Sequence, residues 1–246
     1  MNLAYTRIEL KRSLRNPRFM IFAFAFPVFL FLLQTNVFIH DGDPGKTTAT
    51  AVIMVNMLAF GVFFAAMTNG GRLATERAAG WQRQLRLTPL TGRGYMLGKG
   101  LTGLLLGLPV LIAVPLIAAL TSGVHLDPAA WTRIILGTWL GAVPFVLLGL
   151  LIGQLARPET LQPLNMGLSL VMGFLGGMWI PIDAMPDWMQ GLAPVLPSYW
   201  LTQLGRGAVT GDLSQNLATT AAVLAAWTIA LGALVIWRYR KDSSRS

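Results

Sequence analysis

The sequence predicts an all-α, polytopic membrane protein with six transmembrane helices. Hydrophobic residues make up 54% of the chain and charged residues only 12%, whereas soluble domains usually contain about 25% charged residues. The charged residues are also gathered in short patches between long apolar runs. An integral membrane protein is therefore the class that the composition favours.

Six apolar runs have the length of about 20 residues that a helix needs to cross the hydrocarbon core. In chain order, these expected spans one to six are residues 19–38, 50–68, 95–120, 131–155, 161–180 and 217–237. The first run is too long for the apolar part of a signal peptide and lacks a small-residue cleavage site, so we expect it to remain as span one. Four prolines inside the spans predict kinks: Pro27, Pro109, Pro115 and Pro144.

The distribution of Lys and Arg predicts the orientation of the spans. Sixteen of the 19 basic residues fall on the side that holds the N-terminus, and only Lys46, Arg133 and Arg206 fall on the other side. Because basic residues are enriched in cytoplasmic loops, we expect both termini to be cytoplasmic in a multi-pass protein of the cell membrane. The net charge of +9 comes from these membrane borders. It therefore indicates contact with membrane lipid and not with nucleic acid.

Residues 1–18 form a separate piece before the membrane domain of residues 19–246. Read as a helix, this arm places three leucines on one face and a basic row beside them: Leu3, Leu10 and Leu14, then Arg7, Lys11, Arg15 and Arg18. The pattern predicts an interfacial helix with its basic groups near anionic lipid. An ordinary basic flank of span one explains the same residues equally well.

Residues 74–87, between spans two and three, predict a short basic helix on the cytoplasmic side. Ala74, Ala78, Trp81 and Leu85 fall on one helical stripe. Thr75 is suited to cap its start, and Pro89 ends the pattern. A helix that lies flat between two spans is suited to docking a cytosolic partner.

Residues 181–200 are neither a span nor an ordinary loop. Pro181, Pro186, Pro194 and Pro197 interrupt any long helix, yet the residues between them are strongly apolar. We expect a re-entrant helical hairpin in the outer leaflet, because irregular backbone at that depth must be buried in protein or line a cavity. The alternative is a proline-rich loop with interfacial tryptophans.

No nucleotide, metal or catalytic site is predicted on this chain. Gly45-Lys46-Thr47 resembles the end of a phosphate-binding loop, but the glycine required five residues before Gly45 is His40. Gly98-Lys99 fails in the same way, because Arg93 occupies the required position. The chain contains no cysteine, and its two histidines lie in separate outer loops. A membrane enzyme is therefore the weakest of the possible functions.

Ionisable residues are nearly absent from the middle of the spans, which argues against transport driven by ions or protons. Neutral polar, aromatic and Met residues of spans two and five are candidates for a pathway that carries a large amphiphile: Asn56, Phe60, Phe63, Asn165, Met166, Ser169 and Met172. Hydrogen bonding between helices explains the polar members equally well.

Four glycine pairs at small-xxx-small spacing predict close helix contacts: Gly103/Gly107, Gly137/Gly141, Gly149/Gly153 and Gly173/Gly177. A general richness in glycine, with 26 in the chain, is the other explanation.

Three motifs in this order resemble the permease subunits of the type 2 exporter class of ABC transporters, and most closely the daunorubicin and multidrug export permeases. They are ERAAG at 76–80 with LRLTPL at 85–90, the entry into span three at 95–99, and GGMWIP at 176–181 with PDWM at 186–189 and PS at 197–198. The resemblance covers nearly the whole chain. One departure is Trp81, where the family commonly has threonine.

The resemblance implies a permease that dimerises, either with a second copy or with a sister subunit, and binds a cytosolic ABC ATPase that carries ATP and Mg²⁺. Residues 74–87 would be the coupling helix, with contacts from Thr75, Glu76, Arg77, Gly80, Trp81, Arg83 and Leu85. The arm would be a connecting helix near the ATPase. Spans one and five would meet across the dimer, and spans two and five would border the substrate.

The function implied is export of a hydrophobic or amphiphilic compound, such as a drug or antibiotic, across a bacterial cell membrane. Export of lipid or polysaccharide is the alternative within the same class. From another class, a membrane anchor or sensor that uses the same cytosolic helix without moving a substrate also fits.

Overall fold

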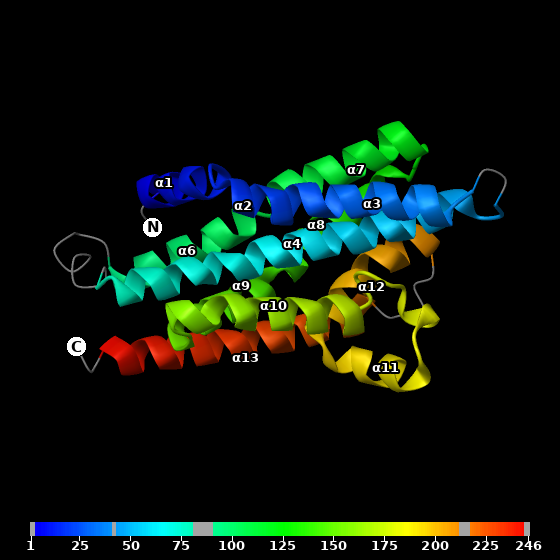
Figure 1. The fold of residues 1–246 in the computed structure, drawn as a ribbon. Helices are drawn as coiled ribbons and strands as arrows, with labels where there is room; N and C mark the ends of the chain where they lie inside the picture. Colours follow the sequence, from blue (N-terminus) through cyan, green and yellow to red (C-terminus); the bar gives the residue numbers. More distant parts are fainter. Residues whose placement is uncertain (1–2, 41–42, 81–90, 212–216, 244–246) are drawn as a thin grey trace.

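The computed structural model describes residues 3–40, 43–80, 91–211 and 217–243. All regular elements in these ranges are helices, most of which run side by side along one direction (Figure 1). Five segments are long and apolar enough to cross a membrane: Ile21–Phe38, Lys46–Ala78, Gly94–Ser122, Pro128–Leu155 and Leu217–Lys241. The predicted all-α membrane fold is therefore confirmed, with five candidate spans.

The first span is preceded by a short helix and begins with an irregular turn. Helix α1 (Leu3–Leu14) is followed by α2 (Pro17–Met20), the π-helix η1 (Ile21–Ala25) and α3 (Phe26–Phe38). The π-helix lies directly before Pro27, which has no backbone N–H to donate to the preceding turn. A local change of helix type at this proline agrees with the kink that the sequence predicts.

Helix α4 (Lys46–Ala78) is the central helix of the bundle. It is 33 residues long, and 83% of its most apolar window is buried, a larger share than in the other four candidate spans. It continues through Gly70-Gly71 to Ala78 without a break. The helix start that the sequence suggests at Thr75 is therefore wrong, because the Thr75 hydroxyl donates to the Arg72 carbonyl oxygen at 2.9 Å inside α4.

The third and fourth expected spans are each built from two helices. They are α6 (Gly92–Leu105) with α7 (Leu108–Ser122), and α8 (Pro128–Gly141) with α9 (Val143–Leu155). The breaks precede Pro109 and Pro144, as expected for residues that cannot continue the hydrogen-bond ladder. Pro115 lies inside α7 without ending it.

Helix α10 (Pro158–Leu175) covers most of the expected fifth span, but it is not among the five candidate spans. Its first turns carry Glu159, Gln162 and Asn165, which lower its apolarity. Figure 1 nevertheless shows α10 lying along α4. The last helix is α13 (Leu217–Ser243), which packs against α9 and α12.

The chain after α10 folds into short helices, three of which begin at or directly after a proline. The short helices are η2 (Ile182–Ala184), α11 (Asp187–Leu192), η3 (Ala193–Val195) and α12 (Pro197–Thr210). The expected hairpin ends at residue 200, whereas α12 continues ten residues further, to Thr210. Its buried face mixes Ser198, Thr202 and Gly205 with Leu201, so α12 lacks the continuous apolar run that identifies a span.

The closest helix contact joins α4 and α9. A Cβ atom added to Gly70 would overlap the backbone of Gly149, and one added to Gly153 would overlap the backbone of Gly70. The predicted contact through Gly149/Gly153 is therefore confirmed. We call the end of the bundle where α1 begins and α13 finishes the termini end, and the end that carries α11 the opposite end (Figure 1).

Candidate functional site

A cluster of charged side chains is buried at the termini end. Lys99, in the second turn of α6, has no exposed surface. Its Nζ lies 2.6 Å from Oε1 of Glu9 in α1 and 2.8 Å from Oε1 of Glu76 in α4. One lysine therefore binds two carboxylates from two other helices, which compensates the cost of removing all three charges from water.

The surroundings of Lys99 add further hydrogen bonds to this cluster. The Asn69 side chain of α4 donates to the Lys99 carbonyl oxygen at 2.6 Å. The Arg72 guanidinium lies 3.7 Å from Glu9 Oε1. Both residues lie on α4, within two turns of Glu76. The cluster thus contains two cationic and two anionic side chains, which balance.

Two tyrosines complete the cluster on the side of α1 and α6. The Tyr95 hydroxyl donates to Glu76 Oε2 at 2.5 Å, and the Tyr95 ring packs against Tyr5 with 5.8 Å between ring centroids. Burial raises the pKa of the Tyr5 hydroxyl far above its ordinary value, and the carboxylates of Glu9 and Glu76 raise it further. Tyr5 is therefore neutral at any physiological pH.

Helix α1 is held by its polar face. Thr6, Glu9 and Ser13 are buried, while the Leu10 and Leu14 side chains pack against a small apolar cluster of the protein. The exposed residues are Arg7, Ile8, Lys11, Arg12 and Arg15. Leu10 and Leu14 of the predicted leucine face thus contact protein, on a helix that Glu9 anchors to Lys99.

Arg77, the neighbour of Glu76, reaches in a different direction. Its guanidinium donates to the carbonyl oxygens of Gly153, at 3.2 Å, and Gln154. These carbonyl groups belong to the last turn of α9, where a helix has unsatisfied acceptors and partial negative charge. Glu76 and Arg77 therefore connect the end of α4 to α6 and α1 on one side and to α9 on the other.

Four further predicted coupling residues come after Arg77 in the chain. Gly80 has φ +70°, a left-handed conformation that glycine adopts without strain, and it turns the chain after α4. Trp81, Arg83 and Leu85 lie outside the described residues. Of the predicted set, the structure brings Glu76 and Arg77 into partly buried contacts inside the chain.

The predicted pathway residues divide into three groups. Asn56, Phe60 and Phe63 are buried in α4, and Phe63 packs edge-on against Phe145 of α9 at 5.2 Å. Asn165, Ser169 and Met172 lie on the buried face of α10. Met166 is 62% exposed on the outside of the same helix, so it does not join the others.

Sequence reasoning missed the cluster around Lys99. Glu9 and Lys99 are 90 residues apart in the chain, and each has an ordinary explanation as part of a polar flank. A signal was available, since Lys99 follows an apolar turn inside the expected span three and an ionisable residue there requires a partner.

The fold and this cluster define a multi-pass membrane protein with a charged junction of three helices at one end. Residues 2–209 match the model of the ABC-2 type transporter family, and the chain belongs to that family. It is similar to a Bacillus subtilis (strain 168) protein described as "Putative transport permease YvfS". The two are 32% identical over 203 residues, which cover 81% of this chain and 80% of the relative.

The family assignment fixes the general role. The chain is a membrane permease, a transport subunit without an ATPase domain. Permeases of this family work with ABC ATPase subunits.

Proposed function

We propose that this chain is the permease of an ATP-driven exporter that moves a hydrophobic or amphiphilic compound, such as a drug or antibiotic, across a bacterial cell membrane. In this arrangement, α10 is a sixth span, and both termini are cytoplasmic. Two observations support it: α10 lies along α4 and exposes Leu164, Leu170 and Phe174, and both termini lie at one end of the bundle (Figure 1). The predicted re-entrant hairpin of residues 181–200 would then lie on the outer side.

The single observation that carries the proposal is the position of Glu76. It lies at the end of α4, directly before the segment that would dock on the ATPase, and it contacts Lys99 and Tyr95 of α6. Through Lys99, it is linked to Glu9 of α1. A displacement of residues 74–87 by the ATPase would therefore move α1, α4 and α6 together.

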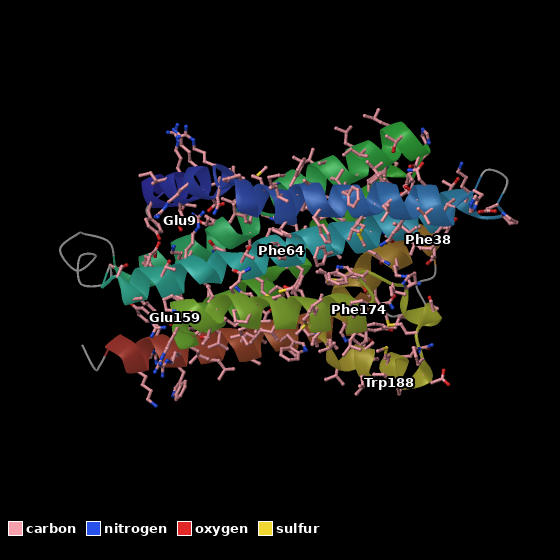
Figure 2. The ribbon with its side chains drawn as sticks, in the orientation of Figure 1. Glu9, Phe38, Phe64, Glu159, Phe174 and Trp188 are labelled. Carbon is pink, nitrogen blue, oxygen red and sulfur yellow. The ribbon has the colours of Figure 1, made fainter. Side chains whose placement is uncertain are left out.

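The partners follow from the same arrangement. A cytosolic ATPase would bind ATP and Mg²⁺ and hold residues 74–87, with Thr75, Gly80, Trp81, Arg83 and Leu85 near the contact. A second permease subunit, identical or a sister chain, would cover the apolar residues that α3 and α10 expose: Phe29, Leu33, Phe38, Met166, Leu170 and Phe174. Figure 2 shows Phe38 and Phe174 near the opposite end of the bundle.

The test is ATP-dependent export by Glu76→Ala and Arg77→Ala variants of the permease, reconstituted with its ATPase in vesicles. We expect both variants to insert and to lose export, because each removes a connection between α4 and its neighbours. Glu159→Ala is the matched control, since Glu159 is an exposed carboxylate at the same end (Figure 2). Normal export by both variants would contradict the coupling role.

The substrate class has its own measurement. We expect amphiphilic drugs to stimulate ATP hydrolysis by the reconstituted complex, whereas stimulation by lipid-linked saccharides alone would favour lipid or polysaccharide export. A complex whose hydrolysis responds to neither, and which exports nothing, would favour the anchor or sensor function.

A further inference from the structure

Trp179, at the opposite end of the bundle, is folded back onto the helix that precedes it. Helix α10 ends at Leu175, and Gly177 has φ +73°, the left-handed conformation that commonly terminates helices. The backbone N–H groups of Met178 and Trp179 then donate to the Gly173 carbonyl oxygen at 3.0 and 3.2 Å. This turn brings the Trp179 indole over the last turns of α10.

Gly173 provides the space that the indole occupies. A Cβ atom at Gly173 would lie 3.2 Å from Cε2 of Trp179, which is closer than ordinary van der Waals contact. The pair Gly173/Gly177, predicted as a contact between helices, therefore has a different use. Gly177 makes the turn, and Gly173 accommodates the ring.

Trp179 connects three helices, at the last turn of α10 and near the middle of α4. Its ring packs edge-on against Phe60 of α4, at 5.3 Å between centroids, and against Phe174 of α10, at 5.0 Å. The Gln34 side chain of α3 donates to its carbonyl oxygen at 3.3 Å. These contacts consist of aromatic rings and one amide hydrogen bond, without an ion pair.

The indole N–H is poorly satisfied in this position. Its Nε1 atom is buried and has no hydrogen-bond partner among the described residues. A buried donor without a partner is unfavourable. Moving the ring away would therefore break no indole hydrogen bond and would expose the donor to water or lipid headgroups.

We infer that Trp179 is the residue that closes the exit of the transport pathway and moves aside when the substrate leaves. The inference rests on the proposed function, which assigns this end of the bundle to the outer side and makes Phe60, the ring that Trp179 contacts, a pathway residue. The exit must open in every transport cycle. A contact between aromatic rings without an ion pair is suited to such repeated opening.

Accessibility of a single cysteine tests this role, since the natural chain contains none. Ser169→Cys places a thiol on the buried face of α10, about one turn before Gly173, over which the Trp179 ring lies. The full chain would be labelled with a membrane-impermeant maleimide in right-side-out and inside-out vesicles. Four backgrounds are compared: the parent, Trp179→Ala, Gly173→Ala and Trp188→Ala.

We expect Trp179→Ala and Gly173→Ala to raise the outside labelling rate by about tenfold or more, because the first removes two edge-to-face ring contacts and the second displaces the ring. Trp188→Ala should leave the rate unchanged. Trp188 is 62% exposed on α11 at the same end (Figure 2), so it controls for the general loss of a tryptophan.

Three outcomes would overturn the inference. They are a rate within about twofold of the parent in both Trp179→Ala and Gly173→Ala, an equal rise in Trp188→Ala, and a rise confined to labelling from the side of the termini. The assay needs neither ATPase nor substrate. If the reconstituted parent complex failed to export, that result would contradict the proposed function. The labelling result would then be interpreted independently of it.

Discussion

The two ends of the bundle are held together by different forces. At the termini end, Lys99 and Glu9 are buried and paired within 2.6 Å, and Glu76 joins them. At the opposite end, Trp179 lies among aromatic rings, and the nearby ion pair of Arg206 with Asp183 leaves the aspartate side chain 73% exposed. A lysine and a glutamate are therefore buried at one end, whereas at the other end the aspartate of the ion pair is on the surface.

The difference suggests what each end does in transport. Leaving one member of a buried ion pair without its partner costs about 3–5 kcal/mol, whereas an aromatic pair contributes about 0.5–1.5 kcal/mol beyond its buried area. The termini end is thus suited to move as one unit, and the opposite end is suited to separate. Four substitutions, from the largest expected effect to the smallest, test this contrast.

Lys99→Met should have the largest effect. It leaves the buried carboxylate of Glu9 and the partly buried carboxylate of Glu76 without their shared cation, and we expect a loss of about 3–5 kcal/mol in the free energy of unfolding. Unfolding in mixed micelles measures it. Adding Glu9→Gln and Glu76→Gln to Lys99→Met should recover part of the loss. A loss below about 1 kcal/mol would remove the contrast between the two ends.

Gly149→Ala should come next, because the added methyl group meets the backbone of α4 at Met67. Backbone cannot move aside as a flexible side chain can, so we expect a loss near the upper part of the 1–3 kcal/mol that is typical of overpacking, about 3 kcal/mol. Gly167→Ala is the control, since no atom lies within 4 Å of a Cβ there. Equal stability of the two variants would show that α4 and α9 are not packed this closely.

Tyr95→Phe removes the hydroxyl that donates to Glu76. Because the acceptor is charged, we expect a loss of about 2 kcal/mol. The same substitution in a Glu76→Gln background should cost less, and the difference measures the coupling between the two side chains. An identical cost in both backgrounds would show that the Tyr95 hydroxyl does not act through Glu76.

Asp183→Asn should have the smallest effect. The Asp183 side chain is 73% exposed, and ion pairs in contact with solvent contribute about 0–1 kcal/mol, less in high salt. We expect a thermal midpoint close to that of the parent. A large destabilisation would mean that the opposite end is also held by charge, which would weaken the contrast.

Local patterns in the sequence predict much of the fold. The apolar runs locate the candidate spans, and Pro109 and Pro144 locate the breaks in two of them. Glycine spacing identifies the contact of α9 with α4 through Gly149 and Gly153. Each of these features depends on residues close together in the chain, where helix periodicity and proline geometry determine the outcome.

Features that depend on distant residues were not predictable in this way. Nothing local to Glu9 indicates that its partner is Lys99, 90 residues further along. Thr75 is a residue type that commonly caps the start of a helix. Here α4 continues past Thr75, because packing of Gly70 against α9 stabilises this part of the helix. Helix α12 was missed because its buried face is built from small and polar residues that fit against α4 and α8.

The unbroken length of helix α4 allows movement at one end to be transmitted along the bundle. It contains no proline and runs unbroken from Lys46 to Ala78, past both Phe60 and Glu76. These two residues are 16 positions apart, which corresponds to about 24 Å along the axis. A hydrogen-bonded helix resists compression, so an axial push at Glu76 would reach the Phe60 ring with little delay and no intervening joint. In the proposed exporter, the same helix would therefore link the ATPase contact at one end directly to the pathway residue Phe60.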